Sequence, residues 1–490
     1  FWLKAPGLEP IPGGGRRFGP RGGGWRPPGG HASSRMRRSD RGGAVPAEFG
    51  VFKTDFDKQV VLRTFERRGW HRAWSDDDDE WDIYWASVHS VRWLFNPENG
   101  RRLLEHQMVS HFPNHYELTR KDLMSRNIKR YRKEREKQLE FEASLVDSAS
   151  AAVASSASLP GEHDLPSEWV PTTFALPSDY AIFVEEFRRH PNATWIAKPT
   201  AQAQGRGIFL VSKLTQLKKW SGGQKPSNQT ALSFKEPYII SRYIQEPLLV
   251  GGKKFDMRLY VLVTNYRPLK AYLYRAGFCR FCVEQYSSDV AEIDNVFVHL
   301  TNVAVQKQAE DYNDRTGGKW AIEDLLLFIE STRGVAAKDK LVGDMEAVIV
   351  HSLKAVQGVL INDRHCFEMY GFDILLDANL KPWLLEVNAS PSLTANTADD
   401  YAMKFALLDD TLTVLDLERY LSGSESQIGG FDLLYRGGSR VGPAEGALYR
   451  SYLGCHNNRQ EQLCKLSLAL AEEEKRRQPP PPPPQQQQQQ

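Results

Sequence analysis

The sequence has few of the features that assign a chain to a specialised class of protein. Five cysteines in 490 residues are too few for a disulfide framework, so we expect a reducing compartment. No apolar run approaches about 18 residues, and no apolar segment stands at the N-terminus, which argues against a membrane span and against secretion. The formal net charge is only +2, so charge alone predicts no affinity for nucleic acid. A hydrophobic content of 41% is typical of a soluble globular protein.

Two of the cysteines, Cys279 and Cys282, are spaced like half of a zinc site. No second pair follows them, and the segment between them alternates like a strand. Structural thiols are therefore the favoured interpretation.

Changes in composition divide the chain into segments. The N-terminal segment is Gly- and Arg-rich and has too little apolar surface to fold; an RNA-binding arm is the less favoured alternative. The expected divisions are a disordered leader at 1–50, a small N-terminal domain at 51–138, an Ala- and Ser-rich linker at 139–168, domains at 169–253 and 254–421, and an extension at 422–490 whose Pro and Gln tracts are disordered.

Separate runs of strand-like and helix-like pattern predict an α+β fold. Helices are expected at Ile322–Ser331 and Leu341–Ile361, and a short amphipathic element at Val88–Leu94. Strands are expected at Trp81–Trp85, Trp195–Ala197, Ile208–Val211, Tyr238–Tyr243, Phe255–Thr264, Lys270–Tyr274 and Phe278–Val283.

A basic segment, Arg120–Lys137, carries nine Lys or Arg against three Asp or Glu at helical spacing. A solvated helix face and a docking surface for an acidic partner are equally compatible with this pattern.

Polar side chains stand at the ends of two short apolar strands, Phe372–Leu376 and Pro382–Val387. Glu386 and Asn388 share one face because side chains alternate along a strand. If Asp377–Leu380 is a tight turn, Asp373 pairs with Leu384 and lies diagonally from Glu386 on that face. Two carboxylates and an amide oxygen with few basic neighbours suit Mg²⁺, whereas an ordinary core hairpin is the alternative.

Four features upstream of this hairpin fit one nucleotide. Lys198 ends an apolar strand and suits a phosphate, and the glycine-containing loop at 203–207 runs into the next strand. The apolar segment Tyr238–Ile244 could wall an adenine. The strand Lys254–Tyr260 places its charged residues on one face, which indicates a polar cleft.

Four motifs carry a family resemblance when taken in order. They are His111–Lys121, Lys253–Arg258, His299–Asn302 and Glu386–Pro391. The chain from about residue 55 to residue 457 resembles the tubulin–tyrosine-ligase-like family, a branch of the ATP-grasp ligases. Within that family it is most similar to the polyglutamylase members, the ninth before the first.

The resemblance implies an ATP-grasp fold in which ATP lies between a central domain at 169–253 and a C-terminal catalytic domain at 254–421. It implies two Mg²⁺ ions on Asp373, Glu386 and Asn388. A free L-glutamate is expected on Arg280 and Lys319. The residues expected to contact ATP are Lys198, Gln204, Gly205, Arg206, Ser241, Arg242, Tyr243, Ile244, Lys254, Phe255, Asp256, Thr301 and Asn302; a Lys is common in the family where this chain has Arg206.

The implied reaction joins glutamate through an amide bond to a side-chain carboxylate by way of an acylphosphate. Arg258, on the polar face of its strand, is expected to stabilise that acylphosphate, and Glu386 is the second expected catalytic residue. The resemblance implies acidic tubulin tails as acceptor, partner subunits, and a location in the cytoplasm on the cytoskeleton, at cilia or basal bodies. A glycine ligase of the same fold and a non-catalytic microtubule-associated subunit are the alternatives.

Overall fold

The computed structural model describes residues 50–74, 79–148, 168–200, 202, 204–220, 237–289, 292–313, 318–395, 397–442 and 451–455. The predicted leader, apart from Gly50, the Ala- and Ser-rich repeats and the Pro and Gln tracts lie outside these residues. The chain divides into residues 1–48 and 49–490, and every described residue belongs to the second unit. Helices and strands are mixed in it, so the predicted α+β class is confirmed.

A ten-stranded sheet is built around the long strand β10 (Lys253–Tyr266). Along one edge β10 pairs with β14 (Glu368–Leu376), which pairs in turn with β15 (Pro382–Asn388). Along the other edge it pairs first with β12 (Phe278–Phe281) and then with β11 (Leu269–Tyr274). The remaining strands of this sheet are β9 (Leu249–Val250), β13 (Lys319–Ala321), β16 (Gln427–Ile428), β17 (Phe431–Arg436) and β18 (Ser439–Arg440).

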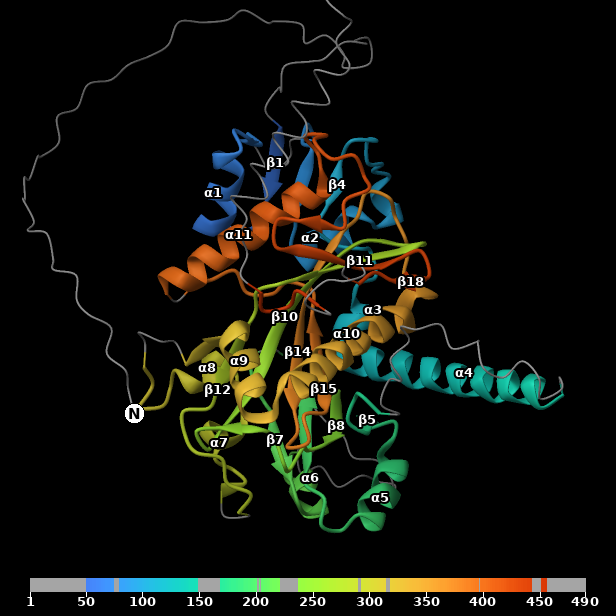
Figure 1. Cartoon of the computed structure of the whole chain (residues 1–490), viewed down its shortest axis with the longest axis vertical. Helices are drawn as coiled ribbons and strands as arrows, with labels where there is room; N and C mark the ends of the chain where they lie inside the picture. Colours follow the sequence, from blue (N-terminus) through green and yellow to red (C-terminus); the bar gives the residue numbers. More distant parts are fainter. Residues whose placement is uncertain are drawn as a thin grey trace, which may run out of the picture. The chain divides into compact units, whose positions relative to one another are not determined.

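The two faces of β10 differ because its side chains alternate. Phe255, Met257 and Leu259 are buried in the main core, which also includes residues of α9 (Ile322–Arg333) and α10 (Val335–Gln357). Asp256 and Arg258 lie on the opposite face, which carries the charges. Farther along, at Tyr260 and Leu262, that face becomes apolar and packs against α1 (Gln59–Arg67) and α11 (Ala398–Leu415). The charged part of the face is thus confined to the first residues of β10, the strand that runs beside β14 in Figure 1.

Two four-stranded sheets complete the architecture. One has parallel pairing and the order β2-β1-β3-β4, and the other has antiparallel pairing and the order β5-β8-β6-β7. Their strands are β1 (Val51–Thr54), β2 (His71–Arg72), β3 (Ile83–Trp85), β4 (Met108–Val109), β5 (Thr173–Leu176), β6 (Trp195–Pro199), β7 (Phe209–Val211) and β8 (Tyr238–Arg242). The remaining helices are α2 (Val88–Leu94), α3 (Tyr116–Thr119), α4 (Lys121–Ser148), α5 (Tyr180–Arg189), α6 (Leu214–Trp220), α7 (Val296–His299) and α8 (Val303–Gln306), with a 3₁₀ turn at Pro97–Asn99.

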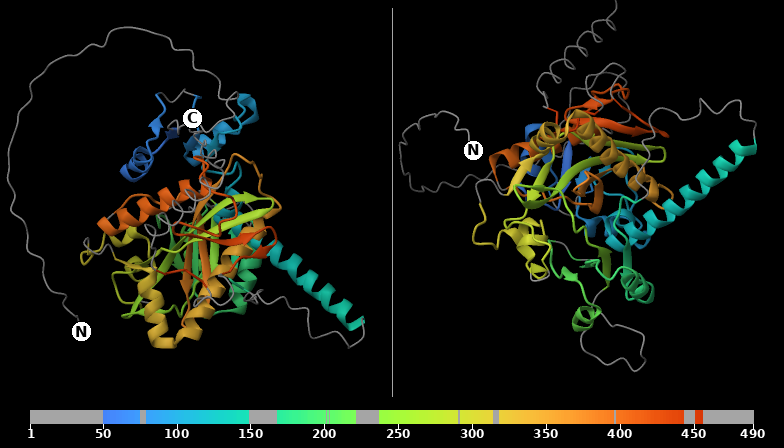
Figure 2. Two further views of the ribbon diagram at one scale, coloured as in Figure 1. Left: turned by 45° about the horizontal axis from the view of Figure 1, so that its top comes forward. Right: turned by 60° about the horizontal axis from the view of Figure 1, so that its bottom comes forward.

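The basic segment is confirmed as helix α4, which extends well beyond it. Leu123, Met124 and Ile128 are buried near its start, and both views in Figure 2 show its far end leaving the body of the sheet. The helix continues to Ser148, so the linker expected from residue 139 does not start there. Charged side chains such as Lys133 and Lys137 are exposed near its middle.

The sheet also continues past the boundary that was expected at residue 421. Strand β17 pairs with β11 from Lys270 opposite Arg436 to Tyr274 opposite Phe431. Phe431 is fully buried in the same cluster as Tyr274. The residues after 421 begin with polar Ser-Gly-Ser and resemble a tail by composition. The apolar face of β17, which follows them, is nevertheless covered by the sheet.

The predicted structural role of the paired cysteines is confirmed. Cys279 and Cys282 are buried free thiols, and burial raises the pKa of Cys282 to about 12. No helix in the described part of the chain is long and apolar enough to cross a membrane.

A buried carboxylate, Asp410, generates a prediction about stability. Its Oδ2 accepts hydrogen bonds from Tyr274 Oη at 3.0 Å and Gly430 N at 2.9 Å, and burial raises its pKa from 3.8 to about 6. The folded state therefore holds a proton that the unfolded state gives up, so this group stabilises the fold most below pH 4 and loses that contribution as the pH rises through 6.

Asp410→Asn cannot ionise and keeps an acceptor for both bonds. Urea unfolding at pH 5 and pH 8 should show a smaller fall in free energy of unfolding for the variant, by on the order of 1–1.5 kcal/mol. Parallel pH profiles for the two proteins would contradict this assignment.

Candidate active site

The carboxylates of the hairpin β14–β15 come together through an irregular register. Leu376 pairs with Pro382 and Ile374 with Leu384, so the turn is one residue longer than expected. A longer turn alone would place the Asp373 side chain on the face of the sheet away from Glu386. A β-bulge between Ile374 and Asp373 accommodates the extra residue and places Asp373 directly opposite Glu386. The expected pairing with Leu384 is wrong, but the shared face is confirmed.

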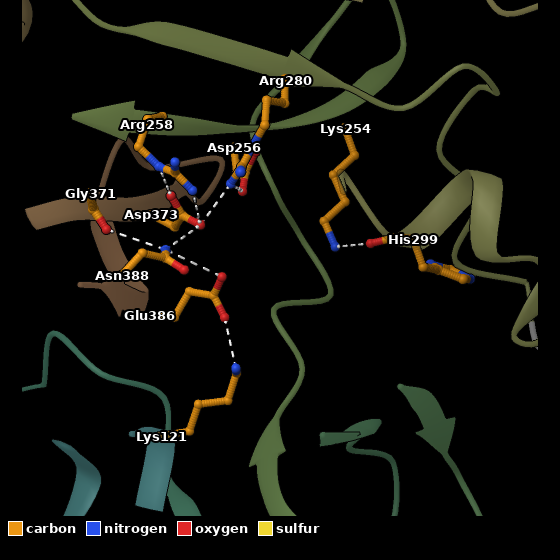
Figure 3. Close-up of polar contacts among 10 residues, drawn as sticks. All are labelled: Lys121, Lys254, Asp256, Arg258, Arg280, His299, Gly371, Asp373, Glu386 and Asn388. Carbon is orange, nitrogen blue, oxygen red and sulfur yellow. Dashed lines mark hydrogen bonds and ion pairs between the residues drawn. The ribbon is translucent and has the colours of Figure 1, made fainter. Parts of the chain in front are cut away.

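Asp373 is held between two arginines (Figure 3). Arg258 Nε and Nη2 donate to its two oxygens at 2.5 and 3.1 Å, and Arg280 Nη2 lies 2.9 Å from Oδ2. Arg280 also pairs with Asp256, its Nε donating to Oδ1 at 2.8 Å. Burial opposes ionisation of Asp373, but the charges of both arginines outweigh it and hold its pKa below the usual value. The expectation of few basic neighbours is therefore wrong.

Glu386 and Asn388 complete the oxygen-bearing group. Asn388 Nδ2 donates to Asp373 Oδ2 at 3.2 Å and to Glu386 Oε1 at 3.5 Å. The outer oxygen of Glu386 lies 3.1 Å from Lys121 Nζ, at the start of α4. The two carboxylates suit Mg²⁺. The Asn388 carboxamide also suits it if the side chain rotates so that its oxygen faces the ion. In the described residues no cluster of three or more His, Cys, Asp or Glu offers another metal site.

A cavity of about 900 Å³, counted with the solvent at its mouth, lies beside these residues. Apolar walls come from strands of two sheets, among them Ile196, Ile239 and Leu375. The predicted residues that line the cavity are Lys198, Ser241, Arg242, Tyr243, Ile244, Lys254, Asp256, Arg280, Thr301, Asn302, Asp373 and Glu386.

Two lysines supply positive charge to the cavity, Lys254 from a buried position and Lys198 from a half-buried one. Lys254 Nζ donates to Tyr243 Oη at 2.9 Å and to His299 O at 2.8 Å, which aims its charge across the cavity. Burial lowers the pKa of Lys254. It also lowers the pKa of Lys198 to about 8, against the opposing effect of Glu386. Both groups are poised to gain from an incoming anion.

The glycine loop lies close to the predicted Thr301–Asn302 segment. Gly205 has φ +79°, and a Cβ there would lie 2.8 Å from Val305 Cγ2 and 3.1 Å from Asn302 Oδ1. Only glycine permits this approach of backbone to Asn302. The side chains of Gln204 and Arg206 are exposed and do not line the cavity.

Two further predicted residues lie elsewhere. Phe255 is 1% exposed in the main core, on the face of β10 away from the cavity, so its side chain does not line the expected ATP site. Lys319 does not line the cavity; its Nζ donates to Asp400 Oδ2 at 2.9 Å, and Lys404 donates to the same oxygen at 3.0 Å. Lys319 is nevertheless opposite Arg280 in the sheet, so the two predicted glutamate-binding cations are neighbours.

Lys121 is the clearest residue that sequence reasoning missed. It lies within a motif quoted for the family resemblance and within the basic segment, but no pattern in the sequence pairs it with Glu386. The apolar lining residues Val170, Leu384 and Leu385 were also missed, because strand pattern does not reveal which side faces a ligand.

The fold and this cavity define an α+β protein with clustered carboxylates beside an anion-attracting pocket. Residues 99–422 match the model of the tubulin-tyrosine ligase family. The chain is 48% identical over 393 residues to the "Probable alpha-tubulin polyglutamylase Ttll1" of Tetrahymena thermophila, covering 78% of this chain and 92% of that protein. It is 41% identical over 454 residues to the "Probable tubulin polyglutamylase TTLL9" of Bos taurus, covering 86% and 92%.

A third relative, the "Probable tubulin polyglutamylase ttll-9" of Caenorhabditis elegans, is 44% identical over 392 residues, covering 80% of this chain and 86% of the relative. The chain belongs to the tubulin-tyrosine ligase family. The predicted resemblance, including its likeness to polyglutamylase members, is confirmed.

The differing environments of the two carboxylates predict different costs of neutralising them. Asp373→Asn leaves Arg258 and Arg280 buried without their shared charge partner and should lower the free energy of unfolding by about 3–5 kcal/mol. Glu386→Gln alters a side chain that is 24% exposed and should cost less than about 1 kcal/mol. Urea unfolding of the two variants measures both values; equal losses would contradict the arginine-bracketed geometry.

Proposed function

We propose that this protein is an ATP-dependent ligase that adds glutamate to side-chain carboxylates of tubulin C-terminal tails. One observation carries the proposal: Asp373 and Glu386 lie opposite each other at a cavity that buried Lys254 and half-buried Lys198 also line. The names of the relatives point to the same reaction. The domain arrangement of an ATP-grasp fold and a cytoskeletal location, at cilia or basal bodies, belong to this proposal.

ATP would occupy the large cavity. The apolar walls around Ile239 and Leu384 suit its adenine, and Lys198 and Lys254 suit its phosphates. Asp373, Glu386 and Asn388 would hold Mg²⁺, which would neutralise charge that develops on the phosphates. The backbone of the glycine loop would approach the same ligand.

Cations outnumber carboxylates around the cavity and the adjoining strands. Arg258, Arg280, Lys319 and Lys404 stand near Asp256, Asp373 and Asp400, while Lys121 and Lys198 stand near Glu386 and Lys254 stands near Asp256. This surplus suits a reaction in which ATP, a free amino acid and an acceptor all bring negative charge.

Different residues of the chain would then act in the two steps of the reaction. An acceptor carboxylate oxygen attacks the γ-phosphorus and releases ADP, and Arg258, which contacts Asp373, would stabilise the resulting acylphosphate. The amino nitrogen of glutamate next attacks the acyl carbon, loses a proton and expels phosphate. Arg280 would bind one carboxylate of that glutamate as a planar fork, and Lys319 would bind the other.

Two cations for one incoming amino acid favour glutamate over glycine, which has a single carboxylate. A glycine ligase remains the second candidate on family grounds. A non-catalytic subunit is disfavoured by the convergence of Asp373, Glu386 and Asn388.

Mass spectrometry of tubulin tails incubated with this protein, Mg-ATP and glutamate should show a ladder of glutamate increments. Glu386→Gln should abolish the ladder while leaving the fold intact. Increments that appear only with glycine, or a full ladder from Glu386→Gln, would contradict the proposal.

The lowered pKa of Lys198 predicts a pH dependence of nucleotide affinity. A protonated lysine attracts phosphate, so affinity for a magnesium-bound, non-hydrolysable ATP analogue should fall as the pH rises from 7 to 9. Lys198→Met should weaken binding at pH 7 about tenfold or more and flatten this dependence. Titration calorimetry at both pH values measures it, and identical slopes for both proteins would refute the role of Lys198.

A further inference from the structure

A second cavity, of about 580 Å³, lies beyond the carboxylates. Its lining includes Phe56 and Lys58 before α1, Trp85 at the end of β3, and Met369 on β14. The loop at 389–394, which directly follows Asn388, forms the rest together with Ser110 and His111. None of these lining residues was assigned a role in the proposed reaction.

Strand alternation puts this cavity on the same face of the sheet as the first. Asp373, Gly371 and Met369 are alternate residues of β14, and their side-chain directions therefore agree. Gly371 separates the two cavities with no side chain of its own. A Cβ there would lie 3.0 Å from Arg258 Cδ and 3.0 Å from Pro391 Cβ. Arg258 thus lies close to Pro391, which lines the second cavity.

A buried relay orients one hydroxyl at the second cavity. Glu368 is fully buried, and its Oε1 lies 2.5 Å from His111 Nδ1 while its other oxygen accepts from Phe112 N at 2.9 Å. His111 Nε2 lies 3.2 Å from Oγ of the exposed Ser390. When His111 Nδ1 donates to Glu368, Nε2 accepts a hydrogen bond from the Ser390 hydroxyl, which can turn to a competing acceptor instead.

The loop is fixed at its other end as well. Lys404 Nζ donates to Thr394 O at 2.6 Å and also to Asp400, which holds Lys319. The loop at 389–394 therefore links the carboxylates, the second cavity and the residue expected to bind free glutamate.

We propose that the second cavity binds the acceptor residue of an acidic peptide, and that Ser390 hydrogen-bonds to that peptide. This inference rests on the proposed function. Lys58 contributes positive charge, and α1 begins directly after it without a side-chain cap, which adds a partial positive charge. Phe56, Trp85 and Met369 offer apolar surface to the methylene groups of a glutamate side chain. In this proposal an acceptor carboxylate would reach Arg258 past Gly371, where Arg258 and Pro391 lie close together.

Ser390→Ala tests the proposal in the full chain. It should raise KM about tenfold for tubulin and for a synthetic peptide of alternating Glu and Gly, because a hydrogen bond to a charged group is lost. KM for ATP and for glutamate should change less than twofold. Ser439→Ala, on β18 away from this cavity, is the matched control. An unchanged acceptor KM, or equal increases for all three substrates, would overturn the inference.

A binding measurement separates this inference from the proposed ligase activity. In a Glu386→Gln background, fluorescence anisotropy of the labelled peptide should show binding that Lys58→Ala and Ser390→Ala each weaken severalfold. Such weakening supports the acceptor site even if the parent protein ligates no glutamate. If the parent protein ligates glutamate but both variants bind the peptide with unaltered affinity, the acceptor site is overturned and the ligase activity stands.

The relay also has the order of groups found where a serine acts as a nucleophile. Covalent labelling of Ser390 by a fluorophosphonate probe, lost in His111→Ala, would overturn the binding role.

Discussion

The buried ion pairs of Asp373 with Arg258 and Arg280 are the interaction on which the site depends. They bring charged groups from β10, β12 and β14 onto one small area of the sheet, where each isolated charge would be costly. The opposite face of β10 is apolar from Phe255 to Val263 and fixes these strands against α9 and α10. The sheet therefore supplies a rigid backbone. The arginines offset the free-energy cost of placing a carboxylate beside an apolar core.

The same face has three regions in sequence along the strands. The cavity lined by Lys198 and Lys254 lies at one end, the ion-paired carboxylates lie in the middle, and the cavity beside Ser390 follows. In our proposal these regions receive the nucleotide, the reacting groups and the acceptor. Helix α4 adds a physical connection, since its first residue, Lys121, contacts Glu386 while its exposed basic residues extend outward, suited to steering an acidic tail.

Sequence reasoning reached the strands and the shared face of Asp373 and Glu386 because alternation is a local property. It did not predict the register. The longer turn and the bulge at Ile374 have opposite effects on the face that Asp373 takes, and residue type alone predicts neither of them. Lys121 and Arg280 meet their carboxylates across large sequence separations, which no local pattern encodes. Phe255 was assigned to ATP through its place in a motif, although its alternation already pointed it to the core.

The central claim is that one sheet face gathers a metal-bound triphosphate between these carboxylates and lysines. A crystal structure with Mn²⁺ and a non-hydrolysable ATP analogue tests it most directly. The account predicts anomalous density for Mn²⁺ among oxygens of Asp373, Glu386 and Asn388, with the phosphates beside Lys198 and Lys254. Density for the metal or the nucleotide elsewhere, with these side chains still bound only to arginine and lysine, would contradict it.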